Sequence, residues 1–83
     1  MRVTLLYFAV ARERVGRSSE TVFLLPNATA GDALEAACVA HPELRPLSDK
    51  LRLAIDQAFC PASAPLKDGC EVALIPPVSG GRA

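Results

Sequence analysis

The end of the last apolar run places the strongest constraint on the fold of this chain. The segment Val72-Ala73-Leu74-Ile75 is rich in strand formers, and Pro76-Pro77 and then Val78-Ser79-Gly80-Gly81 follow it directly. Proline has no N–H to donate to a sheet ladder, so the proline pair ends the strand. Glycine has no Cβ and accepts backbone angles and close approaches that other residues do not. We therefore predict a folded domain over residues 1–77 and a narrow, flexible Gly-Gly tail over residues 78–83.

The length and charge of the chain restrict its class. Its 83 residues suffice for one small domain, and 51% of them are apolar, so a compact core is expected without disulfides. Nine basic residues balance nine acidic ones, which gives no support to a nucleic-acid or membrane-surface role. The sequence shows neither a signal-peptide pattern nor an apolar run of about 18 residues. We expect a cytoplasmic protein that binds neither nucleic acid nor membrane.

The cysteines and the single histidine do not form a recognisable metal or disulfide pattern. Cys38, Cys60 and Cys70 are odd in number and lack C-x-x-C spacing, and His41 has no cysteine at zinc-finger spacing. Cys38 is expected in the core, whereas Cys60 and Cys70 lie near predicted turns and are candidates for exposure. We predict no bound metal. No Ser/His/Asp set or carboxylate pair indicates a catalyst that acts alone.

Four strand regions are predicted from strand-forming residues, at 2–8, 20–25, 51–59 and 71–75. The best helix covers residues 29–41, with Thr29 as N-cap and Asp32 completing a variant capping box. Its apolar stripe consists of Ala30, Ala33, Leu34, Ala37 and Cys38. Residues 9–19 are predicted to be a polar loop with at most a short helical turn at its start, and residues 43–50 a helical turn or loop.

One helix over a small mixed sheet is an α+β arrangement. In the first strand, Val3, Leu5 and Tyr7 lie on one face and Thr4, Leu6 and Phe8 on the other. If the first and last strands are neighbours, an apolar patch forms on the face away from the helix, from Leu6, Phe8, Ala73 and Ile75. We predict that Phe8, Ile75 and also Phe59 contact a partner. The alternative for these side chains is ordinary core.

Three segments of the sequence resemble the small subunit of molybdopterin synthase (MoaD), a ubiquitin-like β-grasp sulfur-carrier family. The first is Leu5-Leu6-Tyr7-Phe8-Ala9 with Arg12-Glu13 and Val15-Gly16. The second is Leu53-Ala54-Ile55-Asp56-Gln57, in which Asp56 replaces the usual Asn. The third runs from Leu66-Lys67-Asp68-Gly69 to Gly81, with Cys70 where an acidic residue is common. The resemblance implies a β-grasp fold in which a small mixed sheet packs on one main helix.

The resemblance also implies the chemistry of the tail. An E1-like adenylyltransferase (MoeB-like) would use ATP and Mg²⁺ to adenylate the carboxylate of Gly81, and sulfur transfer would convert it to a thiocarboxylate. A synthase large subunit (MoaE-like) would admit the tail and pass the sulfur to cyclic pyranopterin monophosphate. Gly80 keeps the tip narrow, and the four residues 78–81 reach about 13 Å at roughly 3.3 Å per residue.

The resemblance implies a set of partner contacts, at Phe8, Arg12, Phe59, Ile75, Pro76, Pro77, Val78 and Ser79. For Arg12, a solvated loop arginine is an equally good interpretation. The chain would hold no cofactor permanently. It would not be a catalyst by itself but the sulfur-donating subunit of a sulfurtransferase complex.

Two residues, Arg82 and Ala83, follow Gly81. The carboxyl group of Gly81 is therefore part of a peptide bond, whereas the chemistry requires it as a free carboxylate. We expect a protease to remove them before activation. Two other functions remain open. One is a sulfur carrier for thiamine, cysteine or tRNA thiolation, or a protein modifier. The other is a binding module that is never activated.

Overall fold

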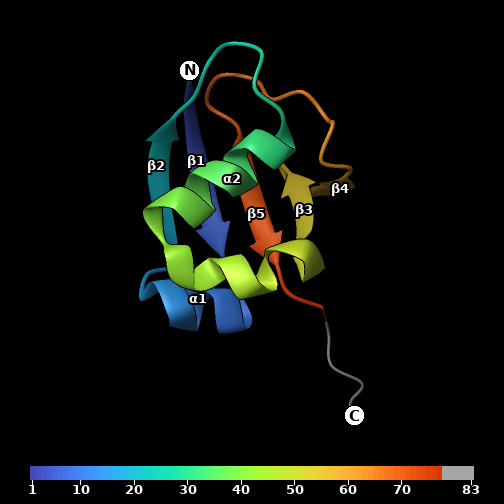
Figure 1. Cartoon of the computed structure of the whole chain (residues 1–83). Helices are drawn as coiled ribbons and strands as arrows, with labels where there is room; N and C mark the ends of the chain where they lie inside the picture. The colour runs from blue at the N-terminus through green and yellow to red at the C-terminus, as the bar shows by residue number, and fades with distance from the viewer. Residues whose placement is uncertain (78–83) are drawn as a thin grey trace.

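A computed structural model describes residues 1–77 of the chain; the predicted tail, residues 78–83, lies outside this described part. The elements in chain order are β1 (Arg2–Tyr7), α1 (Ala9–Val15), β2 (Ser19–Phe23), α2 (Ala30–Ala40), the 3₁₀ helix η1 (Pro42–Lys50), β3 (Arg52–Ile55), β4 (Ala58–Cys60) and β5 (Glu71–Ile75). The strands form one mixed sheet in the order β2-β1-β5-β3-β4, and α2 lies across one face of it (Figure 1). The α+β prediction is confirmed.

The first and last strands lie side by side at the centre of the sheet. β1 and β5 pair in parallel, with Leu5 opposite Val72 and Tyr7 opposite Leu74. The other neighbouring pairs, β1–β2, β3–β5 and β3–β4, are antiparallel. Because side chains alternate along a strand, this register sends one apolar row from each central strand toward α2 and a second row to the opposite face. The condition on which the predicted apolar patch depended, that these two strands are neighbours, is therefore met.

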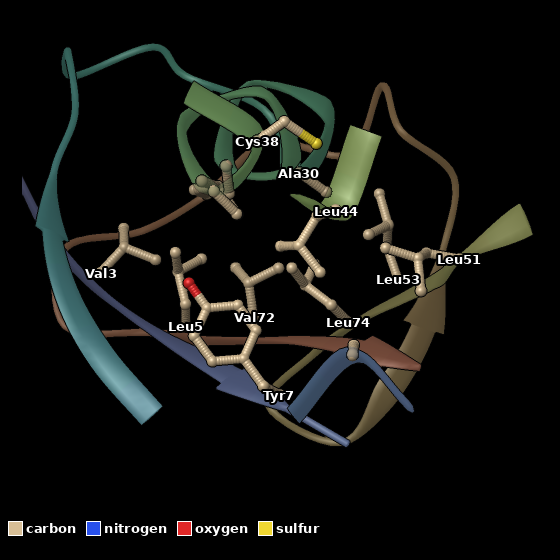
Figure 2. Close-up of a cluster of buried hydrophobic side chains, with 14 of the residues drawn as sticks. Val3, Leu5, Tyr7, Ala30, Cys38, Leu44, Leu51, Leu53, Val72 and Leu74 are labelled. Carbon is tan, nitrogen blue, oxygen red and sulfur yellow. The ribbon is translucent and has the colours of Figure 1, made fainter. Parts of the chain in front are cut away.

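The core lies between the sheet and α2 (Figure 2). The predicted row Val3, Leu5 and Tyr7 is buried, as are Val72 and Leu74 from β5. On α2 the buried residues are Ala30, Ala33, Ala37 and Cys38, all of which are small. Small side chains let the helix axis approach the sheet, and Leu44 from η1 is fully buried beside them. Each fully buried leucine or valine stabilises the fold by roughly 1.5–3 kcal/mol.

The start of α2 is held by the predicted capping box. The Asp32 N–H donates to the Thr29 hydroxyl at 3.3 Å, and the Thr29 N–H donates to the Asp32 carboxylate at 2.8 Å. These bonds satisfy N–H groups that have no partner within the helix. The helix ends at Ala40, and η1 begins two residues later at Pro42.

The prediction of a polar loop over residues 9–19 with at most a short helical turn was wrong, because α1 occupies residues 9–15. The N–H groups of Ala11 and Arg12 donate to the Phe8 carbonyl, and Ala11 is fully buried. Gly16 ends the helix with a left-handed φ of 84°, which suits glycine. Ala11 is the buried residue of this short helix, which has no apolar stripe. The sequence therefore shows only weak helical periodicity here.

The single strand region predicted over residues 51–59 is two strands joined by a tight turn. Asp56 and Gln57 have φ values of 47° and 75°, and two consecutive positive values form a two-residue hairpin turn. Asp56 is fixed in place because its N–H donates to the Glu71 carbonyl and its carboxylate accepts from the Glu71 N–H. Gly is the usual residue at the second position of such a turn, and Gln57 occupies it here. The sequence therefore lacks the usual signal for a hairpin.

Candidate functional site

The face of the sheet away from α2 carries an apolar surface next to the point where the chain leaves β5. We call this surface the outer-face patch; it consists of Leu6, Phe8, Ala54, Phe59, Ala73 and Ile75. Leu6 is opposite Ala73, Ala73 is opposite Ala54, and Ala54 is opposite Phe59, so four strands contribute one continuous row. The structure therefore brings together the predicted partner-contact residues Phe8, Phe59 and Ile75.

The outer-face patch is hollow at its centre. A depression of about 340 Å³ is lined by its six residues together with Gln57 and Glu71. Ala54 and Ala73 are almost fully buried and lie low, whereas Phe8 is 44% and Phe59 61% exposed. Large exposed aromatic side chains around a floor of small residues make a surface suited to receiving an apolar group of a partner.

The predicted tail begins at the edge of this patch. Ile75 and Pro76 are half-buried and Pro77 is exposed, and Ile75 lies opposite Arg52 in the sheet. Val78, Ser79, Gly80 and Gly81 lie outside the described residues, so their roles stay predictions. Within residues 1–77, Leu74 is the last buried core residue, and Ile75, Pro76 and Pro77 add none.

Two arginines have a bearing on this surface, one of which the sequence reasoning missed. Arg12, a predicted contact, is exposed on α1, and its partner role stays a prediction. The overlooked residue is Arg52 on β3, whose guanidinium carbon lies 4.5 Å from the centroid of the Phe59 ring. The strand alternation that points Leu51 and Leu53 toward the core already placed Arg52 on the outer face.

A polar cluster on the other face was also missed. The Tyr7 hydroxyl donates to Glu20 Oε1 at 2.6 Å, and His41 Nε2 contacts the same oxygen. The Tyr7 and His41 rings meet edge to face with centroids 5.8 Å apart, and Arg17 lies 3.6 Å from Glu20 Oε2. This cluster ties the ends of β1 and α2 to β2. The sequence offered no signal for it, because Tyr7, Glu20 and His41 come from separate parts of the chain.

The environment of Glu20 shifts two pKa values. Burial opposes ionisation of Glu20, but hydrogen bonds from Tyr7 and His41 and the nearby positive charge outweigh it and lower the pKa of the carboxyl group. Burial, together with the hydrogen bond to Glu20 and its negative charge, raises the pKa of Tyr7 above its ordinary value. Glu20 is therefore an ionised group within a hydrogen-bonded cluster in the folded protein.

We expect Glu20→Gln to lower the free energy of unfolding at pH 7 by about 1.5–3 kcal/mol, the usual range for hydrogen bonds to charged groups. Because the folded protein lowers the pKa of Glu20, this stabilisation is complete above the ordinary value of 4.5 and is lost as pH falls through the lower folded pKa. Urea denaturation of both proteins should thus show a gap that is present above pH 4.5 and closes as the pH falls below that value. Glu35→Gln, at an exposed ion pair with Arg45, is the control and should have little effect. A gap for Glu20→Gln that is independent of pH would contradict the assignment.

The three cysteines differ in exposure. Cys38 is buried as predicted, and burial raises the pKa of its thiol. Cys70 is only 4% exposed, so its candidacy for exposure was wrong: it follows a turn but faces the core. Cys60 is half-buried in β4.

Within residues 1–77 there is no group of three or more His, Cys, Asp or Glu side chains that could hold a metal ion. No helix in that range has the length and apolar character needed to cross a membrane.

A family model described as the ThiS family matches residues 5–81. The chain belongs to the ThiS family. Relatives named molybdopterin synthase sulfur carrier subunit are similar over most of their length. The protein from Aedes aegypti is 40% identical over 92 residues, covering 98% of this chain and 90% of the relative. The one from Chlamydomonas reinhardtii is 39% identical, covering 98% of this chain and 100% of the relative. The resemblance drawn from the sequence motifs is confirmed.

The fold is also confirmed as ubiquitin-like β-grasp. The crystal structure of SAMP1, a small archaeal modifier protein from Haloferax volcanii, superposes on this chain with a TM-score of 0.88. The two are 30% identical, and the match covers 98% of this chain and 100% of that one. The departures of this chain from the usual motif fit the fold. Asp56, where the resemblance leads one to expect Asn, accepts the hydrogen bond from the Glu71 N–H through a side-chain oxygen that Asn also has. Cys70, where the resemblance leads one to expect an acidic residue, is buried.

Proposed function

We propose that this chain is the sulfur carrier subunit of a molybdopterin synthase. The observation that carries the proposal is the identity of 39–40% across 98% of the chain to relatives with that name. The family match extends to Gly81, the residue whose carboxylate the chemistry requires. The outer-face patch beside the exit of β5 supports it, because a carrier must dock on another protein while its tail is used.

The proposed reaction uses one group of this chain, the carboxylate of Gly81. An E1-like adenylyltransferase joins it to AMP from Mg·ATP and releases pyrophosphate, which gives the acyl carbon a leaving group. A sulfur donor then displaces AMP and leaves a thiocarboxylate. Within the synthase, this sulfur passes to cyclic pyranopterin monophosphate and the carrier returns to a carboxylate. Two carriers per pterin would supply the two dithiolene sulfurs.

The described domain suits the role of a rigid holder for such a tail. Its buried core ends at Leu74, and Pro76 and Pro77 stop the sheet from extending. Residues 78–81 span about 13 Å when extended, at roughly 3.3 Å per residue. The large subunit can therefore bind the outer-face patch and receive the tail without any loss of core contacts. In this scheme the activating enzyme binds ATP and Mg²⁺, and this chain supplies only the carboxylate that is adenylated.

Activation requires that Arg82 and Ala83 be removed. While they follow Gly81, its carbonyl belongs to a peptide bond and offers no oxygen anion to ATP. A protease that cleaves after Gly81 is therefore part of the proposal.

Intact-mass spectrometry of the protein from its native host tests this proposal. We expect a chain that ends at Gly81, part of which carries the added mass of sulfur in place of oxygen. A strain without the activating enzyme serves as control and should keep the cleavage but lose the sulfur. Detection of nothing except the uncut chain, with no thiocarboxylate, would refute the carrier function.

A second candidate is a protein modifier, which the similarity to the small archaeal modifier protein favours. Its tail would be activated in the same way, but Gly81 would end in an amide bond to a lysine of another protein. Affinity capture of the tagged chain under denaturing conditions would reveal such conjugates. If the chain is the synthase subunit, capture under native conditions should recover the synthase large subunit, and no conjugates should be found. Undiminished molybdoenzyme activity after gene deletion, with no paralogue present, would exclude the first candidate.

A further inference from the structure

One positive charge lies at the edge of the outer-face patch, next to Phe59 and Ile75. Arg52 lies on the outer face of β3, opposite Ile75 in the register, and its guanidinium stacks on Phe59 at 4.5 Å. The ion pairs formed by residues 1–77 join Arg17 and His41 to Glu20 and Arg45 to Glu35. Arg52 takes part in none of these pairs and is exposed.

Because Arg52 stacks on Phe59 and lies opposite Ile75, a partner that covers this end of the outer-face patch meets its guanidinium. A partner that buries the Phe59 ring must also exclude water from the cation stacked on it. Burying an unpaired cation is costly, whereas a cation that meets a carboxylate with good geometry is compensated. An arginine is well suited to such a pair because its planar donors bind both carboxylate oxygens.

The other charges on this face make the surface asymmetric. Glu71 lines the far side of the hollow, and Asp56 beside it already accepts the Glu71 N–H. Glu71 and Ile75 are four residues apart on β5, so these carboxylates lie about 13 Å from the level of Arg52 at roughly 3.3 Å per residue. The outer-face patch thus has a positive end, where the chain leaves the sheet, and a negative end. Docking in the reverse orientation would bring like charges together.

We propose that the synthase large subunit presents a carboxylate to Arg52 when it covers the outer-face patch. The ion pair between Arg52 and this carboxylate fixes the orientation of the carrier on the large subunit, close to Ile75, where the chain leaves β5. This inference rests on the proposed function, and it adds Arg52 as a determinant of partner specificity. The partner surface it describes is apolar opposite Phe8, Phe59 and Ile75 and acidic opposite Arg52.

The sign of the effect of Arg52→Leu on affinity tests the inference. With a carboxylate opposite, Arg52→Leu leaves that group buried and unpaired, and we expect binding to the large subunit from the same organism to weaken by about 30-fold or more. Without one, the same change removes a desolvation cost and enlarges the apolar contact, so binding would tighten. Affinity that is unchanged or tighter overturns the inference. Isothermal titration of the chain ending at Gly81 provides the measurement.

Three further measurements make the result specific. Lys67→Leu removes the same charge from an exposed turn outside the outer-face patch and should leave the affinity within about threefold, as expected for a rim charge. Thermal unfolding of Arg52→Leu should match that of the wild type, because the side chain is exposed. Arg52→Glu should abolish binding, and replacement of one acidic residue of the large subunit by Arg should restore it. Failure of every such replacement to restore binding would count against a direct pair.

The inference and the proposed function fail in different ways. If the unaltered chain does not bind the large subunit at all, the proposed function is wrong and the inference falls with it. If the unaltered chain binds and forms a thiocarboxylate while Arg52→Leu binds as well or better, only the inference is wrong.

Discussion

A chain that ends at Gly80 is expected to support no molybdopterin formation, whereas a chain that ends at Gly81 should be fully active. Removing Gly81 moves the terminal carboxylate back by about 3.3 Å, one extended residue. Catalytic groups act only on an atom placed correctly, and a displacement of this size is much larger than the shift of about 1 Å that already lowers rates 100-fold. Thiocarboxylate formation and synthase turnover, measured with purified partners, provide the two readouts.

The fold should be intact in both truncated chains. The buried core that residues 1–77 form runs from Val3 to Leu74, so we expect the same free energy of unfolding for chains ending at Gly80 and Gly81. The chain ending at Gly81 also separates trimming from activation, because it needs no protease. Activity in the Gly80-terminated chain would show that the carboxylate of Gly81 is not the reactive group. An unfolded product would show that the tail contributes to the core.

The second large effect is expected for Phe8→Asp, which should weaken binding to the large subunit by roughly 30-fold or more, the range of an interface hot spot. The substitution places a charge within the outer-face patch, where a partner would exclude water. Stability should change by only about 1 kcal/mol, because Phe8 is the N-cap residue of α1 and Asp is a favoured N-cap that offsets part of the lost apolar contact.

Phe23→Asp is the matched control for this substitution. Phe23 belongs to β2, is 78% exposed and lies outside the outer-face patch, so the same change there should leave the affinity nearly unaltered. Calorimetric unfolding and titration on both variants separate stability from binding. A large loss of stability in Phe8→Asp with affinity retained would mean that Phe8 serves the core rather than a partner.

The elements that the sequence revealed are those whose cause is local. The strand over residues 71–75, its stop at Pro76, and the capping box at Thr29 all depend on neighbours a few residues away. The alternation in residues 2–8 placed Phe8 on the correct face because the side-chain period of a strand is fixed. The loop predicted in place of α1 and the strand region predicted in place of the β3–β4 hairpin failed, since there the decisive contacts come from elsewhere: the buried Ala11 and the Asp56–Glu71 hydrogen bonds.

The sequence by itself determined that the chain is a small α+β domain ending in a Pro-Pro stop and a Gly-Gly segment, because covalent geometry and side-chain periodicity act over short distances. Only the tertiary structure decided which residues meet. The parallel pairing of β1 with β5 brings Phe8 beside Ile75, and the β3–β5 register adds Arg52 to the same surface. The cluster of Tyr7, Glu20 and His41 has the same origin. Contacts between distant segments depend on strand order and register, which are set by packing of the whole core rather than by any one stretch of the sequence.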